Sequence, residues 1–326
     1  MAVVSVVQSN NIRIAVEEAI QLLGGIERFV QPKDKVVIKP NLVFGLPPFT
    51  GLTTDYPIVQ AVIETCQKVG SLDLAIAEGS GGIDTKLAFR IGGYAELAER
   101  YSAKLIDLNE SETTSVSVPR GVSVQDLRFP RIILECDVLI NVPKLKLYRV
   151  VPGHAEWASL AVKNLMGVLP GKGEYSHTRP SDFSIPLSPE FLTTTGKYYH
   201  PTYQKWWRPT GEKKRIHTNL AQGLVDINTV IKPALNIIDG VIVSNDVDMT
   251  TTTAQDPFNL NTILASQDPL ALDCIATRIG GLDLSNISYL QLAAEGGLGE
   301  SDFGRIEIRG TQLDEIIKTW ETELAN

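Results

Sequence analysis

The chain has 326 residues, of which 43% are hydrophobic and 21% are charged, as in an ordinary globular protein with a large core. Its net charge of −8 argues against binding to nucleic acid or to an anionic membrane surface, because both need a basic surface. The N-terminus lacks the basic segment of a signal peptide, and no apolar run reaches the ~20 residues that span a bilayer. We therefore expect a cytoplasmic protein that does not enter a membrane.

Apolar runs typical of buried strands alternate with stretches that have the spacing of helices. In chain order, strands are expected over 3–7, 35–38, 72–77, 104–108, 137–141, 234–238, 260–265 and 305–308, with a β excursion at 109–125. Helices are expected over 12–23, 55–69, 84–91, 95–101, 131–135, 157–166, 213–230 and 288–294, from 269 onward, and at the C-terminus. This alternation predicts an α/β fold over residues 1–326, with a mostly parallel sheet and helices on both faces, as one unit or two closely joined lobes.

Polar residues follow two of the predicted strands. Lys39 and Asn41 come after the strand at 35–38, and Glu78 and Ser80 lie in a glycine-rich loop after the strand at 72–77. In open α/β sheets, ligands bind at the carboxyl ends of the strands. Asp55 stands near the start of the helix that follows the first of these loops. We predict that these five residues bind a ligand, although a plain turn also accounts for the glycine-rich loop.

Three lysines lie in an apolar, glycine-rich stretch between residues 142 and 177. Lys144, Lys146 and Lys163 are separated by Leu, Val, Ala and Pro, with Glu156 as the only acid between them. Burial of an unpaired cation is costly, so lysines in such surroundings usually meet an anion. We interpret this stretch, with Asn164, as an anion-binding wall of a pocket. Alternatively, each lysine reaches the solvent from the edge of an element.

His177 follows the lysines in a glycine-rich loop and is the best candidate for a general acid or base. Lys163 and Lys144 are the other groups that could move a proton. Alternatively, His177 is an ordinary histidine of a surface loop.

Three acids suggest a divalent metal, since carboxylate oxygens suit Mg²⁺ or Mn²⁺. They are Asp239, Asp268 and Asp273. Asp268 precedes a proline, as helix starts often do, and Asp239 precedes a glycine, as turn residues do. Cys66, Cys136 and Cys274 lie too far apart in sequence for a C-x-x-C pair, so we expect buried thiols and no iron–sulfur cluster.

Residues 178–214 are rich in Pro, Thr, Tyr and Trp, and include Trp206 and Trp207. A long irregular segment within a domain is often a functional lid. Its aromatic residues also suit a contact between copies of the chain. We predict an insertion at the surface that covers the pocket or joins a homo-oligomer.

Several motifs together resemble the family called domain of unknown function 362. They are Val-Val-Ile-Lys-Pro-Asn-Leu from residue 36, Asp-Val-Leu-Ile-Asn-Val-Pro-Lys-Leu-Lys from 137, Val-Lys-Asn-Leu-Met-Gly from 162 and Ala-Ser-Gln-Asp-Pro-Leu-Ala-Leu-Asp from 265. Many relatives carry ferredoxin-like cysteine motifs, and this chain has none. The family pattern often has Lys-x-Lys-Thr-His where this chain has Lys-Leu-Lys-Leu-Tyr at 144–148. The resemblance implies a fold and a site rather than a reaction.

Two functions fit these observations. The first is an enzyme that acts on a small anionic metabolite, a carboxylate or a phosphate, by proton transfer or metal-assisted chemistry. The second is a non-catalytic protein that binds or delivers a cofactor or metabolite. A titratable group with a pKa near neutrality in the pocket would favour the enzyme.

Overall fold

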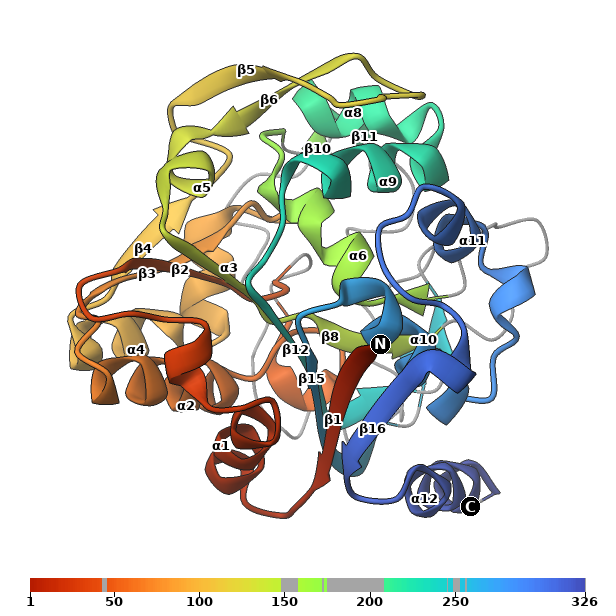
Figure 1. The fold of residues 1–326 in the computed structure, drawn as a ribbon. Coiled ribbons are helices and arrows are strands. Elements are labelled where there is room, and N and C mark those ends of the chain that lie inside the picture. Colours follow the sequence, from red (N-terminus) through yellow and green to blue (C-terminus); the bar gives the residue numbers. More distant parts are fainter. Residues whose placement is uncertain are drawn as a thin grey trace.

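The computed structural model describes residues 1–42, 46–147, 158–171, 173–174, 208–244, 246–248, 253–255 and 257–325. Within these residues, one mixed sheet of ten strands forms the centre of the fold (Figure 1). Eight strands lie side by side in the order β16-β1-β15-β12-β7-β2-β3-β4. Their bounds are Ile306–Gly310, Ala2–Gln8, Phe258–Ser266, Leu235–Ser244, Val138–Asn141, Lys35–Lys39, Asp73–Glu78 and Lys104–Asp107. The remaining two, β8 (Lys144–Leu147) and β9 (Ala158–Ser159), extend the sheet beside β12.

Most neighbouring strands are parallel. The run from β12 through β7, β2 and β3 to β4 is parallel throughout, and β16 is parallel to β1. Only β15, among the eight strands of this order, runs antiparallel to both of its neighbours. The predicted α/β fold with a mostly parallel sheet is confirmed, and a single sheet connects the first and last parts of the chain.

Helices cover both faces of the sheet, as predicted. Successive strand residues point to opposite faces, so one strand contributes to the core on each side. Val36 and Ile38 pack into one core cluster, whereas Val37 between them packs into another. The first cluster lies beneath α1 (Ile12–Leu22), α2 (Tyr56–Lys68), α3 (Thr85–Ile91) and α4 (Tyr94–Tyr101). The opposite face carries α5 (Arg131–Glu135), α6 (Ala161–Asn164), α8 (Gly211–His217), α9 (Leu220–Val230), α10 (Pro269–Ile279), α11 (Ser288–Glu295) and α12 (Leu313–Ala325) (Figure 1).

Three short antiparallel pairs complete the described strands. The predicted β excursion is confirmed as β5 (Thr113–Ser117) with β6 (Asp126–Pro130), although it extends beyond residue 125. The other pairs are β10 (Gly173–Glu174) with β11 (Arg208–Pro209), and β13 (Asp246–Asp248) with β14 (Thr253–Gln255).

The helix predicted over 157–166 is confirmed only from residue 161. Residues 158–159 form β9, which pairs with β8, and only Ala161–Asn164 is α-helical before a 3-10 turn at Leu165–Val168. A residue of another helix holds the start of α6. The two carboxylate oxygens of Asp273 accept the N–H groups of Ala161 and Val162, the first two residues of α6. Apolar spacing alone could not reveal this tertiary constraint.

Two other predictions need adjustment. The stretch at 144–147, for which no element was predicted, is a strand, β8, and the strand predicted to stop at 238 continues to Ser244. Of the predicted insertion, residues 178–207 lie outside the described part, with Trp206 and Trp207, as does His177. Its last residues begin α8 at Gly211.

The cysteines and the helices bear on two further expectations. Cys66 and Cys274 are buried and Cys136 is half-buried. Burial raises the pKa of the Cys66 and Cys274 thiols to about 12, which fits inert structural thiols. No helix within the described residues is long and apolar enough to cross a membrane.

Candidate functional site

Polar residues converge at the carboxyl edge of the parallel strands. Lys39, at the end of β2, lies opposite Asn141 in β7, and Asn141 lies opposite Asn236 in β12. Glu78 ends the neighbouring strand β3. Asp239 lies three residues beyond Asn236 in β12, toward the carboxyl end of that strand. Lys39, Glu78, Asn141 and Asp239 therefore lie toward the same edge of the sheet, as expected for residues that follow parallel strands.

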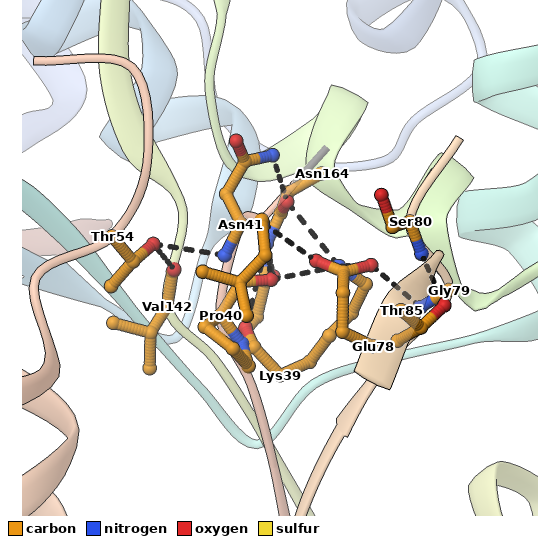
Figure 2. A network of polar contacts seen from close by, with 12 residues as sticks. Lys39, Pro40, Asn41, Thr54, Glu78, Gly79, Ser80, Thr85, Val142 and Asn164 are labelled. Atoms are coloured by element: carbon orange, nitrogen blue, oxygen red, sulfur yellow. Dashed lines mark hydrogen bonds and ion pairs between the residues drawn. The ribbon is translucent and has the colours of Figure 1, made fainter. Parts of the chain in front are cut away.

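Lys39 and Glu78 form a buried ion pair (Figure 2). The Lys39 Nζ atom lies 3.1 and 3.2 Å from the two Glu78 carboxylate oxygens and donates to the Pro40 carbonyl at 2.9 Å. The Glu78 carboxylate also accepts the N–H groups of Leu42 at 3.0 Å and Gly79 at 2.8 Å. Burial lowers the pKa of Lys39, and the charge of Glu78 opposes this change.

The Lys39–Glu78 pair is covered closely by the backbone that follows α6. A Cβ atom on Gly167 would lie 2.6 Å from Glu78 Oε1 and 2.7 Å from Lys39 Nζ. Both distances are too short for a real contact, so glycine allows the chain to approach the pair. Gly167 belongs to the Val-Lys-Asn-Leu-Met-Gly motif, which explains one role of that motif in the fold.

Lys144 and Asp239 form a second buried pair, with Lys144 Nζ 2.9 Å from Asp239 Oδ2. The two groups are close enough for an ion pair, but the Lys144 amine is not oriented to donate a hydrogen bond to this oxygen. Asp239 also accepts the N–H groups of Asp55 at 2.9 Å and Val241 at 3.0 Å. Burial and the charge of Asp239 raise the pKa of the half-buried Asp55 to about 6, and Lys144 opposes this rise.

Two of the acceptors around Lys146 are neutral oxygens. Its Nζ atom donates to Asn41 Oδ1 at 2.6 Å and to the Leu52 carbonyl at 3.1 Å. Burial lowers the pKa of Lys146 to about 7, and the nearby charge of Lys163 lowers it further. Lys163 is itself buried, on the short helix α6. The charges of Lys144 and Lys39 also lower the pKa of Lys146, so these four lysines lie near one another. Their predicted role in holding an anion stays a prediction.

A fifth buried lysine, Lys213 on α8, was not predicted from the sequence. Its Nζ atom donates to the Gly79 carbonyl at 2.8 Å and to Asn109 Oδ1 at 2.9 Å. Burial lowers the pKa of Lys213 to about 7. The charge of Glu78 opposes this change, and the charge of Lys39 adds to it. The sequence gives only a weak indication that Lys213 is buried. Lys213 and the buried Ile216 lie three residues apart and therefore on one face of the helix.

The other predicted site residues have mainly structural contacts. The Ser80 hydroxyl accepts the Ile83 N–H at 3.3 Å. Asp268 caps α10 by accepting two N–H groups of its first turn, and accepts the Glu300 N–H at 2.8 Å. Asp273 accepts the N–H groups at the start of α6. Burial raises the pKa of Asp273 to about 8, against the effect of these hydrogen bonds.

The structure does not bring the three predicted metal ligands into one group. Within the described ranges, no three His, Cys, Asp or Glu side chains are placed to hold a metal ion. Binding of Mg²⁺ or Mn²⁺ by Asp239, Asp268 and Asp273 therefore stays a prediction.

Two hollows of about 330 and 350 Å³ are lined by described residues, and both include Gln267 and Asp268. None of the five buried lysines lines either hollow. A pocket lined by these lysines therefore stays a prediction.

Residues 36–278 match the family described as Domain of unknown function (DUF362). The chain belongs to this family. Lys39, Lys144, Lys146, Lys163 and Lys213 all lie within the matched residues.

Two similar proteins carry descriptions of their own. The chain is 26% identical over 293 residues to the "Thylakoid-associated protein sll1697" of Synechocystis sp., a match that covers 90% of this chain and 76% of that protein. It also resembles a solved structure, the lactate racemase apoprotein from Thermoanaerobacterium thermosaccharolyticum, with a TM-score of 0.35 and 13% identity. That match covers 82% of this chain and 55% of the racemase chain.

Proposed function

We propose that this member of the DUF362 family is an enzyme that acts on a small anionic metabolite, a carboxylate or a phosphate, at the carboxyl edge of its sheet. One observation carries the proposal: five lysines from β2, β8, α6 and α8 are buried at this edge. Lysine is rarely buried in a folded protein unless it is paired. An anionic ligand among these side chains supplies a functional reason for such an arrangement.

The lysines act as one electrostatic unit. The charges of Lys163, Lys144 and Lys39 all lower the pKa of Lys146. Lys39 also lowers the pKa of Lys213, on the other side of Glu78. An anion that enters this region therefore interacts with several cations in surroundings of low dielectric constant, where each interaction is stronger than in water.

Proton transfer is the chemistry that these groups favour. General acids and bases work best when their pKa lies near the working pH. The pKa values of Asp55, at about 6, and of Lys146, at about 7, both lie near neutrality. His177 would be a further acid or base, as its sequence context predicts. A metal-assisted version would add Mg²⁺ or Mn²⁺, which can polarise an anionic substrate.

The proposal is tested by measuring anion binding by calorimetry, with inorganic phosphate and succinate as probes. Lys163→Met removes one buried cation and should weaken binding by about 1.5–3 kcal/mol, the value of a charge-assisted hydrogen bond. The matched control is Lys104→Met, which removes an exposed lysine paired with Asp73 and should leave binding unchanged.

Equal affinity in the two variants would show that Lys163 does not hold the anion and would overturn the assignment of the site. Native mass spectrometry with elemental analysis of the purified protein adds an independent test, because a co-purified anion or a stoichiometric metal would identify the ligand class directly. Tight binding with no turnover of any bound metabolite would instead support a non-catalytic carrier.

A further inference from the structure

We propose that the outer edge of β16 pairs with the same edge of a second copy of this chain, in antiparallel orientation, with Ile308 at the two-fold axis. This interaction surface is separate from the proposed anion site and does not depend on it. The partner is a second copy because the charges along β16 complement one another when the strand is reversed.

The strand β16 stands at one end of the sheet, beside β1 (Figure 1). Among the residues that the structure describes, β1 is the only strand that pairs with it. An edge strand presents N–H and C=O groups that the strands of its own sheet do not satisfy. Such a row of groups can pair with a strand of another molecule.

The pairing with β1 decides which backbone groups of β16 face outward. The Val6 carbonyl accepts the Thr311 N–H at 2.7 Å, so the backbone groups of Val6 face β16. Alternate residues of a strand face the same side, so those of Val4 and Ala2 also face β16. In a parallel ladder, such a residue bonds to the neighbours of the residue paired with it, and the paired residue points away. The paired residues that point outward are Ile306, Ile308 and Gly310.

Antiparallel pairing about Ile308 matches donors with acceptors. Ile308 exchanges its N–H and C=O with the partner's Ile308, and the Gly310 N–H meets the partner's Ile306 carbonyl. The Ile306 N–H is already satisfied within its own chain, where it donates to the Phe303 carbonyl. Gly310 has a φ of 100°, which ends the strand just beyond these contacts.

The charges of β16 favour pairing with its own copy. Glu307 and Arg309 lie on the face that carries α1, where they form an ion pair of 2.8 Å and Arg309 donates to the Leu22 carbonyl at 2.9 Å. Reversal of the strand about Ile308 places Glu307 directly opposite the partner's Arg309, and Arg309 opposite the partner's Glu307. Opposite charges in such cross-strand positions stabilise a sheet, whereas like charges destabilise it.

Ile308 adds an apolar contact on the other face of the strand. Its side chain is 38% exposed, although Ile306 on the same face is 8% exposed and packs into the core beneath α10 and α12. In the proposed dimer, the exposed part of Ile308 packs against the partner's Ile308. Burial of this apolar surface adds to the backbone and charge contacts.

The outer edge of β16 lacks the usual protection of an unpaired strand. Sheet edges that stay single are commonly protected by like charges, a proline or a bulge. The two charged residues of β16 have opposite signs, residues 303–312 contain no proline, and the register with β1 is regular. Because β16 has only five residues, the contact is smaller than a permanent interface, and we expect a dimer that forms reversibly as concentration rises.

Charge reversal tests the surface by sedimentation velocity over a range of concentrations. Glu307→Arg and Arg309→Glu each place like charges opposite one another and should raise the dissociation constant of the dimer at least about tenfold. An equal mixture of these two variants again places opposite charges across the axis, so the two should associate with each other. The matched control is Lys104→Glu, which reverses an exposed charge on β4 at the other end of the strand order and should leave the dimer unchanged.

Hydrogen exchange of the wild type gives a second readout that needs no substitution. The Ile308 and Gly310 amides should exchange more slowly in a concentrated sample than in a dilute one. In each single variant, with its fold checked by circular dichroism, this difference should disappear. A wild type that is monomeric at every concentration, or a dimer that both single variants leave unchanged, would overturn the proposal. Exchange of these two amides that does not depend on concentration would overturn it as well.

Discussion

Replacing Lys39 by methionine should be among the most damaging single changes at this edge of the sheet. The substitution retains most of the side-chain volume but leaves the Glu78 carboxylate buried without its cation. Breaking a buried ion pair from one side costs about 3–5 kcal/mol. Glu78 keeps its hydrogen bonds from the Leu42 and Gly79 N–H groups, so we expect the lower end of this range, about 3 kcal/mol.

The loss should depend on pH in a defined direction. Without Lys39, the Glu78 carboxylate is buried with no cation beside it, and burial disfavours its charged form. The variant should therefore lose less stability in acid than at neutral pH. Urea unfolding followed by circular dichroism should therefore show a smaller difference from the wild type at pH 5 than at pH 7.

The matched control is again Lys104→Met, which removes an exposed ion pair with an N···O distance of 2.6 Å. Exposed pairs contribute about 0–1 kcal/mol. Equal losses of unfolding free energy in Lys39→Met and Lys104→Met would refute the claim that the Lys39–Glu78 pair depends on burial.

Two further substitutions test the shifted pKa values through stability. Asp55→Asn should raise the free energy of unfolding at pH 7 by at most about 3 kcal/mol, from a shift of roughly two pKa units, because the pKa of Asp55 is raised to about 6 in the folded state. The wild type loses stability as pH rises from about 4 to 6, so the two proteins should be equally stable at pH 4. The pKa of Lys213 is lowered to about 7, so the wild type should gain stability as pH rises from 7 toward 10, where only the unfolded chain keeps the proton. Lys213→Met should lose that gain in urea unfolding, and an unchanged pH profile would contradict the burial of an ionisable amine there.

The location of the site could be predicted from the sequence because it depends on a general rule. Polar residues that directly follow apolar strands are brought to one edge by the parallel sheet. Lys39 and Glu78 were found in this way, and the structure joins them in a single ion pair. The pairing itself could not be predicted, since 39 residues separate the two side chains and nothing in either motif indicates its partner.

The residues that the prediction missed are those whose role comes only from tertiary contacts. Lys213 begins a basic run, and Lys214 beside it is exposed. Only the docking of α8 decides which of them is buried. Asn236 follows a leucine inside an apolar strand and carries no visible mark in the sequence. Its place at the site comes from the register of β12 and β7, which sets it opposite Asn141.

Asp273 has a structural role that the sequence did not indicate. A buried acid one turn into an apolar helix suggested a metal ligand, yet its two oxygens accept the N–H groups of Ala161 and Val162. These contacts hold the start of α6, which is only four residues long and carries both Lys163 and Asn164. So short a helix has little stability of its own. The position of two site residues therefore depends on a carboxylate from α10, and the aspartate serves the site by fixing the backbone that carries its lysine.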